Sequence, residues 1–227
     1  ALAQHGVNKG PRTGPLTVVV STRGATGSDP GTQDLLFGDP DGIVCQLEDV
    51  TYCGGSGPLG NVCAAEASPN RGLLALRDLN HLTIFSSDAA RANAFYQDLF
   101  GFSIRAYQGP TAPTMAVGPG VQFLMFTGGG APSATPRPAS INHACMTMDG
   151  FKPDEVLKAL DSYGLKPREA GGPAGPMRHY VTMRMENRGG APGGTPELYF
   201  TDPDGLLMQL QDSTYCGGSG LLGEVCK

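Results

Sequence analysis

Two Asn-His pairs, at residues 80–81 and 142–143, hold the side chains in this sequence best suited to chemistry. Both pairs open strand-like segments, and they lie 62 residues apart in what reads as two halves of one repeat. A pseudo-two-fold axis between the halves would bring the imidazoles of His81 and His143 to a common centre. Two neutral imidazoles facing one point suit a divalent transition metal, with Fe, Mn, Zn, Ni and Cu all open. The alternative is that both histidines only pack and form hydrogen bonds.

Each Asn-His segment is followed by an amphipathic stretch that ends at a glycine, Gly101 or Gly164. These stretches predict helices at 88–100 and 153–163, the first with Ser87 as its N-cap, and the glycines supply the C-terminal stops. Short segments bounded by Gly and Pro follow each helix and predict strands. They are 102–107, 114–117 and 121–126 in the first half, and 166–170, 179–186, 196–201 and 206–211 in the second.

A longer repeat joins the start and the end of the chain. Residues 36–63 read LFGDPDGIVCQLEDVTYCGGSGPLGNVC and residues 199–226 read YFTDPDGLLMQLQDSTYCGGSGLLGEVC, 163 residues apart without a gap. We therefore expect residues 1–63 to be the C-terminal part of a truncated first module, 64–77 a linker, and 78–227 a complete second module with a Cys- and Gly-rich tail. An additional polypeptide, either a precursor fragment or another subunit, is expected to complete the first module, because an open sheet edge is a liability.

Two segments of the second module carry a family resemblance. HLTIFSSDAARANAFYQDLFGF (81–102) and ELYFTDPDGLLMQL (197–210) resemble the opening and closing segments of the vicinal oxygen chelate superfamily. That superfamily includes glyoxalase I, bleomycin-binding and fosfomycin-resistance proteins, and extradiol dioxygenases. The resemblance implies an α+β fold of paired βαβββ units that form a curled mixed sheet around a central cavity. This chain would hold one complete module plus part of a second.

The resemblance also implies a third metal ligand and a catalytic tyrosine. Superfamily ligands come from the first strands and from an acidic position four residues after the DPDG motif, which here is Gln209. The first copy has Gln46 there, so the usual glutamate is missing from both. Tyr199 lies ten residues before Gln209, the spacing of the catalytic tyrosine in extradiol dioxygenases, and the first copy has Leu36 instead. A His-His-Gln set leaves the metal charge uncompensated and favours an anionic ligand.

His179 is a further candidate because its strand-like segment belongs to the same half-unit, where it adjoins Tyr180. An imidazole there could act as a general acid or base, and an ordinary core or surface role stays open. Together these residues indicate a metal-dependent enzyme acting on a small oxygen-rich molecule, of dioxygenase-like (oxidoreductase) or lyase/isomerase-like type. The open alternative is a non-catalytic module that binds and sequesters a small ligand, of the bleomycin-resistance type.

The six cysteines fall into two groups. Four occupy repeated positions, as Cys53 with Cys63 and Cys216 with Cys226, each pair ten residues apart around a glycine-rich segment. Two local disulfides are the leading interpretation, which indicates a secreted or periplasmic protein, and four reduced cysteines are the alternative. The other two, Cys45 and Cys145, lie in strand-like segments and are expected to be buried free thiols.

The composition indicates a globular protein whose partner is a small molecule. Hydrophobic residues make up 40% of the chain, and the net charge of −5 does not favour nucleic acid. No apolar run is long enough to span a membrane.

Overall fold

The structure, a computed structural model, describes residues 2–24, 27–28, 31–50, 52, 54, 67–128, 138–172 and 174–218. The chain divides into two compact units. The first comprises residues 1–71 together with 94–99, and the second comprises residues 72–93 with 100–227. The division after residue 71 falls inside the segment that the sequence predicts to be a linker.

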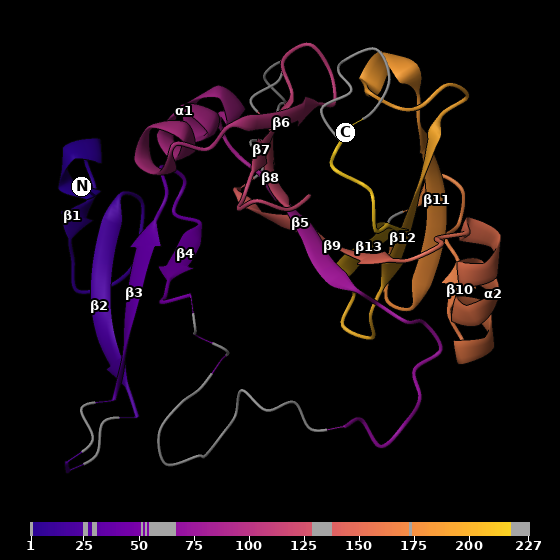
Figure 1. Cartoon of the computed structure of the whole chain (residues 1–227), viewed down its shortest axis with the longest axis horizontal. Helices are drawn as coiled ribbons and strands as arrows, with labels where there is room; N and C mark the ends of the chain where they lie inside the picture. Colours follow the sequence, from indigo (N-terminus) through magenta and orange to yellow (C-terminus); the bar gives the residue numbers. More distant parts are fainter. Residues whose placement is uncertain are drawn as a thin grey trace. The chain divides into compact units, whose positions relative to one another are not determined.

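The first unit is a four-stranded sheet in the order β1-β2-β3-β4, drawn in indigo and violet in Figure 1. Phe37 is fully buried in this unit, and its ring centroid lies 6.4 Å from that of Phe95. The elements of this unit are η1 (Leu2–His5), β1 (Asn8–Lys9), β2 (Thr17–Arg23), β3 (Thr32–Gly38) and β4 (Val44–Leu47).

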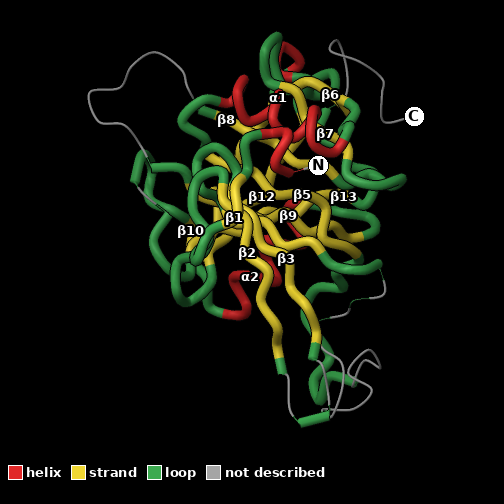
Figure 2. Tube along the Cα trace, turned by 90° about the vertical axis from the view of Figure 1, so that its left-hand side faces the viewer, coloured by secondary structure: helices red, strands yellow, loops and turns green. Residues whose placement is uncertain are grey.

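The second unit contains one nine-stranded mixed sheet in the order β10-β11-β12-β13-β9-β5-β8-β7-β6. Short helical segments accompany the strands and loops that make up most of the described chain (Figure 2). The combination of a mixed sheet with a few helices confirms the α+β class. The sheet is open, with β10 and β6 at its ends. The predicted curl of the sheet around a cavity therefore stays a prediction. The elements from residue 78 onward are β5 (Asp78–Phe85), α1 (Ala89–Phe100, of which residues 94–99 belong to the first unit), β6 (Ile104–Tyr107), β7 (Pro113–Ala116), β8 (Phe123–Thr127), β9 (Ser140–Met148), α2 (Pro153–Tyr163), β10 (Lys166–Pro167), β11 (Arg178–Arg184), η3 (Glu186–Arg188), β12 (Thr195–Thr201) and β13 (Leu207–Asp212).

The helix boundaries follow the residues that favour them. Pro153 begins α2, where its missing N–H costs nothing, and Gly164 ends it in the left-handed conformation at φ 111°. At the start of α1 the predicted cap Ser87 is wrong by one residue. Asp88 is the cap, because its Oδ1 accepts a hydrogen bond from the Arg91 N–H at 3.0 Å.

The two hairpins of the 163-residue repeat pair in equivalent registers. Leu36 lies opposite Gln46 in β3 and β4, and Tyr199 lies opposite Gln209 in β12 and β13. Each DPDG motif turns in the same way, because the first aspartate accepts backbone N–H bonds from the residues two and four positions later. The duplicated sequence therefore gives duplicated local structure.

The two faces of the β12–β13 hairpin differ in character. Leu198 and Leu210 are fully buried in a cluster with Val156 and Leu160 of α2. Because successive strand residues point to opposite faces, Tyr199 and Gln209, the immediate neighbours of these leucines, face away from α2. That other face also carries buried side chains, but they are polar, including Gln209. Burying polar side chains lowers the stability of a fold unless they find partners, so this face is a candidate for a functional site.

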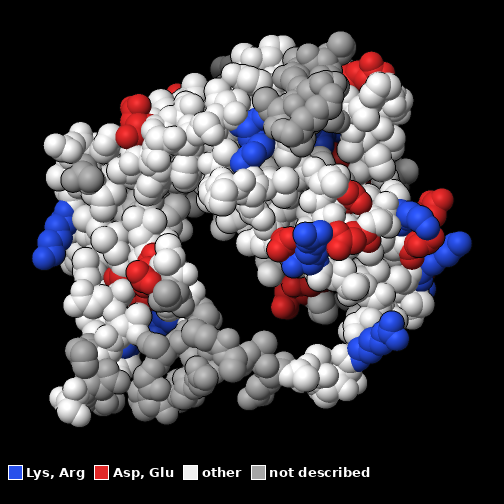
Figure 3. Space-filling model, viewed as in Figure 1, with Lys and Arg blue, Asp and Glu red and all other residues white. Residues whose placement is uncertain are grey.

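On the face shown in Figure 3, acidic and basic side chains of the described residues interleave, with no large patch of one sign. The described residues also contain no helix with the length and apolar character needed to cross a bilayer.

Candidate metal centre

Strand pairing brings the predicted ligands to one face of the second unit's sheet. His81 of β5 pairs with Cys145 of β9, Cys145 with Gln209 of β13, and Gln209 with Tyr199 of β12. Register partners on neighbouring strands point to the same side, and His143, two residues before Cys145, points there too. We call this side the histidine face.

The side-chain atoms of the three predicted ligands meet at short distances. His81 Nε2 lies 3.3 Å from His143 Nε2, and His143 Nε2 lies 2.9 Å from Gln209 Oε1. All three residues are buried. Among the described residues, no group of three or more His, Cys, Asp and Glu side chains is arranged to hold a metal ion. Gln209 therefore has to complete any centre built on the two histidines.

Two asparagines determine which ring nitrogens carry protons. Asn80 Nδ2 donates to the Tyr215 carbonyl at 2.8 Å, so Asn80 Oδ1 is the atom that lies 2.8 Å from His81 Nδ1. His81 Nδ1 must then carry the proton, which leaves Nε2 with a free lone pair. His143 Nδ1 lies 2.6 Å from Asn142 Oδ1, to which it can donate in the same way. Such a second hydrogen bond is what orients metal-binding histidines.

The donor set fits a divalent cation. His81 Nε2 presents a lone pair to a point at which His143 Nε2 and Gln209 Oε1 also converge. When His143 carries its proton on Nδ1, the form that its contact with Asn142 Oδ1 favours, all three atoms offer lone pairs to a cation. Among the described residues, the buried Gln209 Nε2 has no hydrogen-bond partner. The residues at this point are therefore suited to metal coordination.

Burial keeps both imidazoles neutral at physiological pH. Desolvation lowers the pKa of His81 well below its usual value, and the neighbouring His143 and Arg184 lower it further. Desolvation likewise lowers the pKa of His143 to about 4. A neutral imidazole is the form that coordinates a metal, so neither histidine has to lose a proton first at pH 7.

Aromatic rings enclose the pair of histidines. Phe123 stacks on His81 with ring centroids 4.2 Å apart, and Tyr199 meets His143 edge-on at 5.3 Å. Tyr180 stacks on Tyr199 at 5.1 Å. Desolvation, with Glu197 next in effect, raises the pKa of Tyr199, so this phenol stays protonated. Tyr199 can therefore donate a hydrogen bond but does not act as a base.

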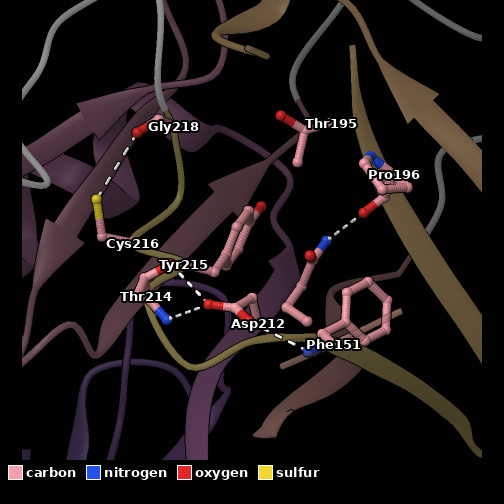
Figure 4. Close-up of a pocket in the computed structure, with 9 residues that line it drawn as sticks. Phe151, Thr195, Pro196, Asp212, Thr214, Tyr215, Cys216 and Gly218 are labelled. Carbon is pink, nitrogen blue, oxygen red and sulfur yellow. Dashed lines mark hydrogen bonds between the residues drawn. The ribbon is translucent and has the colours of Figure 1, made fainter. Parts of the chain in front are cut away.

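A cavity of about 460 Å³ is lined by nine residues, none of them a predicted ligand (Figure 4). Two of its lining residues tie it to the histidine face. Gln211 follows Gln209 by two residues on β13, and the Tyr215 ring lies 5.8 Å from the ring of His81. The other lining residues are Phe151, Thr195, Pro196, Asp212, Thr214, Cys216 and Gly218.

Residues 78–210, which contain all three predicted ligands, match the family model described as the Glyoxalase/Bleomycin resistance protein/Dioxygenase superfamily. This chain belongs to that superfamily. The resemblance seen in the sequence is confirmed. No curated protein sequence matches the chain.

Solved structures agree with this superfamily at the level of the fold. The Mn(II)-bound glyoxalase from Novosphingobium aromaticivorans is 15% identical with a TM-score of 0.53, over 88% of this chain and 57% of that one. A catechol 2,3-dioxygenase is 14% identical with a TM-score of 0.52, over 98% and 70%. The 2,3-dioxygenase LapB from Pseudomonas sp. KL28 is 16% identical with a TM-score of 0.51, over 92% and 64%. This chain therefore covers only part of the length of each of these three solved structures.

The structure separates His179 from the metal centre. Its neighbour Tyr180 stacks on Tyr199 on the histidine face, so His179 points to the opposite face. There its Nε2 lies 2.8 Å from Asp161 Oδ1 of α2. We therefore assign no acid–base role to His179 at this centre.

Several residues near the centre were not singled out as site residues by the sequence. Arg184 is 1% exposed, whereas the sequence gives an arginine a solvated position by default. It donates to Glu197 Oε1 at 2.9 Å, to the Gly217 carbonyl at 2.6 Å, and to the Tyr215 hydroxyl. The repeated TYCGG motif contains both Tyr215 and Gly217. This repeat is the feature of the sequence from which their role beside Arg184 could have been proposed.

The two unpaired cysteines are free thiols in the structure, with Cys145 fully buried and Cys45 partly buried. Burial raises the pKa of both thiols, so they resist ionisation at neutral pH. Three of the repeated cysteines, Cys53, Cys63 and Cys226, lie outside the described residues. The two local disulfides therefore stay a prediction.

Proposed function

We propose that this chain is a metal-dependent enzyme that acts on a small oxygen-rich molecule, with a divalent transition metal held by His81, His143 and Gln209. One observation carries the proposal. Two imidazole nitrogens and one amide oxygen from three strands converge in a buried position. The superfamily and the glyoxalase and dioxygenase folds described above support the same class of chemistry.

The metal, when bound, would supply a Lewis acid that polarises a ligand oxygen and stabilises developing negative charge. The protein offers three neutral donors, so an anionic substrate such as a catecholate or an enolate balances the charge. The nearby carboxylate of Glu197 is already engaged by Arg184 at 2.9 Å. A substrate anion therefore does not have to compete with a protein carboxylate for the metal.

The chain's own residues have two further roles in this proposal. Phe123 and Tyr199, which contact the rings of the histidines, form apolar walls that bind a flat substrate and exclude water. Tyr199 keeps its proton because burial raises its pKa, so it donates a hydrogen bond to a substrate oxygen. The cavity of about 460 Å³, whose wall includes Tyr215 with its ring 5.8 Å from that of His81, has room for a small molecule.

Metal uptake tests the proposal directly. Titration calorimetry of the chelator-treated protein with Mn²⁺, Fe²⁺ and Zn²⁺ should show one site per chain. His81→Ala and His143→Ala should abolish that uptake. His179→Ala is the matched control and should retain uptake, because its imidazole lies on the opposite face of the sheet.

Turnover then separates the enzyme from a sequestering module. The metal-loaded protein is assayed for oxygen consumption with a panel of catechols and for isomerisation of hemithioacetals. Turnover that is lost in Tyr199→Phe supports the enzyme. Tight ligand binding without turnover would replace it with the sequestering alternative, and absence of metal uptake would overturn the metal centre itself.

A further inference from the structure

The second unit contains a buried guanidinium clasp that holds the start of the glycine-rich tail. Arg184 of β11 donates to Glu197 Oε1 of β12, to the Gly217 carbonyl and to the Tyr215 hydroxyl. The Arg184 guanidinium also lies 4.9 Å from the centroid of the Tyr215 ring. One fully buried cation thus ties residues 213–218, which we call the tail segment, to two strands of the sheet.

The first unit contains the same clasp at equivalent positions. Arg23 of β2 donates to Asp34 of β3 at 2.6 Å, to the Tyr52 hydroxyl at 2.7 Å and to the Gly54 carbonyl at 3.4 Å. The residues have the same order and the same hydrogen-bond partners as in the second unit. The side chain of Arg23 is 48% exposed, whereas that of Arg184 is 1% exposed. The clasp is therefore a repeated device for folding back the tail, and only the second copy is buried.

Burial in the second unit comes from close packing of the tail segment on β7 and β8. The Tyr215 ring lies 6.1 Å from the ring of Phe123. Gly217 has φ +95°, and a Cβ atom there would lie 3.0 Å from the Thr114 side chain and 3.1 Å from Phe123. Only glycine fits this position without displacing its neighbours. The tail segment is therefore held in one docked conformation.

The docked tail reaches the metal centre through a single asparagine. The Tyr215 carbonyl accepts the Asn80 Nδ2 hydrogen at 2.8 Å, and this bond turns Asn80 Oδ1 toward His81 Nδ1. Without that carbonyl, Asn80 could rotate and present its NH₂ group to His81 instead. His81 would then keep its lone pair on Nδ1 and its proton on Nε2, the atom that faces His143.

We propose that the docked tail segment is a positioning element that sets the tautomer of His81. In this assignment Tyr215 and Asn80 are positioning residues, and neither has to touch a substrate or a metal. The inference rests on the proposed function only for its effect on metal affinity, because the tautomer is a property of the metal-free chain. His143 provides an internal comparison, since β9, which carries its partner Asn142, is joined to the tail segment at its other end, where the Met148 carbonyl accepts the Ser213 N–H at 3.0 Å.

The full-length double variant Tyr215→Ala/Gly217→Ala is designed to undock the tail. The first change removes the ring and hydroxyl contacts, and the second introduces the clash at φ +95°. The matched control is Tyr52→Ala/Gly54→Ala, which makes the same changes in the first unit, where the clasp contacts no histidine. Multiple-bond ¹⁵N–¹H NMR of histidine-labelled, metal-free protein at pH 7.5 reports the tautomer of each ring.

In the wild type and in the first-unit control, His81 and His143 should both carry the proton on Nδ1. In the second-unit double variant, His81 should shift toward the Nε2–H form while His143 stays unchanged. Metal affinity should fall in proportion to the fraction of His81 that keeps the competent tautomer, about tenfold when a tenth remains. A wild-type His81 in the Nε2–H form, or a double variant that keeps the Nδ1–H form, would overturn the inference.

Single asparagine variants keep the test decisive if the double variant does not fold. Asn80→Leu should convert His81 to the Nε2–H form, and Asn142→Leu should convert only His143. A His81 that stays Nδ1–H in Asn80→Leu would overturn the inference. Tautomer shifts without any metal uptake by the wild type would support the positioning role and reject only the metal-dependent function.

Discussion

Replacing Gln209 with glutamate should tighten metal binding, and this change tests the centre most directly. Gln209 Oε1 lies 2.9 Å from His143 Nε2, and its side chain is 1% exposed. Gln209→Glu keeps the size and the coordinating oxygen of the side chain and adds a negative charge. In the metal-bound state that charge faces the cation, and in the metal-free state it is buried without a partner.

The expected gain is the balance of two opposing energies. At a separation of roughly 3 Å and an effective dielectric constant of about 20, a carboxylate attracts a dication by on the order of 10 kcal/mol. Desolvation favours the protonated carboxyl in the metal-free variant, and ionising it on metal binding costs several kcal/mol, which offsets most of that attraction. A net gain of ~2.8 kcal/mol corresponds to about 100-fold in Kd. The same burial should destabilise the metal-free variant by roughly 3–5 kcal/mol.

Titration calorimetry with Mn²⁺ and Zn²⁺ measures the affinity, and urea unfolding in the presence of a chelator measures the stability. Gln211→Glu is the matched control. It adds the same charge two residues along β13 on the same face, where Gln211 Nε2 donates to the Pro196 carbonyl at 3.1 Å. The control should not tighten metal binding 100-fold, because residue 211 contributes no donor to the centre.

Two results would refute the reasoning. An unchanged Kd in Gln209→Glu would show that position 209 does not coordinate the metal. An equal gain in Gln211→Glu would show that only the general electrostatic potential matters, not the position of the donor. A tighter Kd together with a less stable metal-free variant is the expected pair of outcomes.

Three further predictions concern pH, the clasp and the thiols. Burial lowers the pKa of His143 from 6.5 to about 4, so the metal-free protein should be most stable above pH 6.5. Its free energy of unfolding should fall by up to roughly 3 kcal/mol as the pH falls from 6.5 to 4. A free energy of unfolding that calorimetry finds unchanged over that range would contradict this prediction. Arg184→Met should lower the free energy of unfolding by about 3–5 kcal/mol, because it leaves a carboxylate buried without its partner. The same change at the exposed Arg23 should have little effect in urea unfolding, and equal losses would argue against burial as the cause. Thiol titration of the denatured, unreduced chain should find two free thiols, Cys45 and Cys145, and six would rule out the disulfides.

Much of the fold could be predicted from local sequence signals. The amphipathic stretch from Pro153 to Gly164 gave the bounds of α2 without error, because proline and glycine restrict the backbone at those two positions. The strand segments between turn residues agree with β6–β8 and β11–β13 to within a few residues. These signals depend on residues that are neighbours in the chain, so they can be recognised from the sequence alone.

The candidate ligands could also be proposed from sequence, because a repeat carries symmetry. The equal positions of His81 and His143 in two half-repeats predicted that their side chains would meet, and the structure places their Nε2 atoms 3.3 Å apart. The sequence did not show which face of the sheet each strand residue occupies. His179 and Tyr180 are neighbours in the chain, and only the pairing of β11 with β12 decides which of them faces the centre.

The sequence by itself determined the repeats, the helices and the positions of the two histidines, since these follow from spacing and local backbone preference. Tertiary structure alone decided how the centre is completed. The buried Arg184, the Tyr215 carbonyl and Asn80 come together from segments separated by up to 135 residues. No local pattern marks an arginine for burial, because its desolvation is tolerated only where Glu197 and the folded tail supply every partner at once.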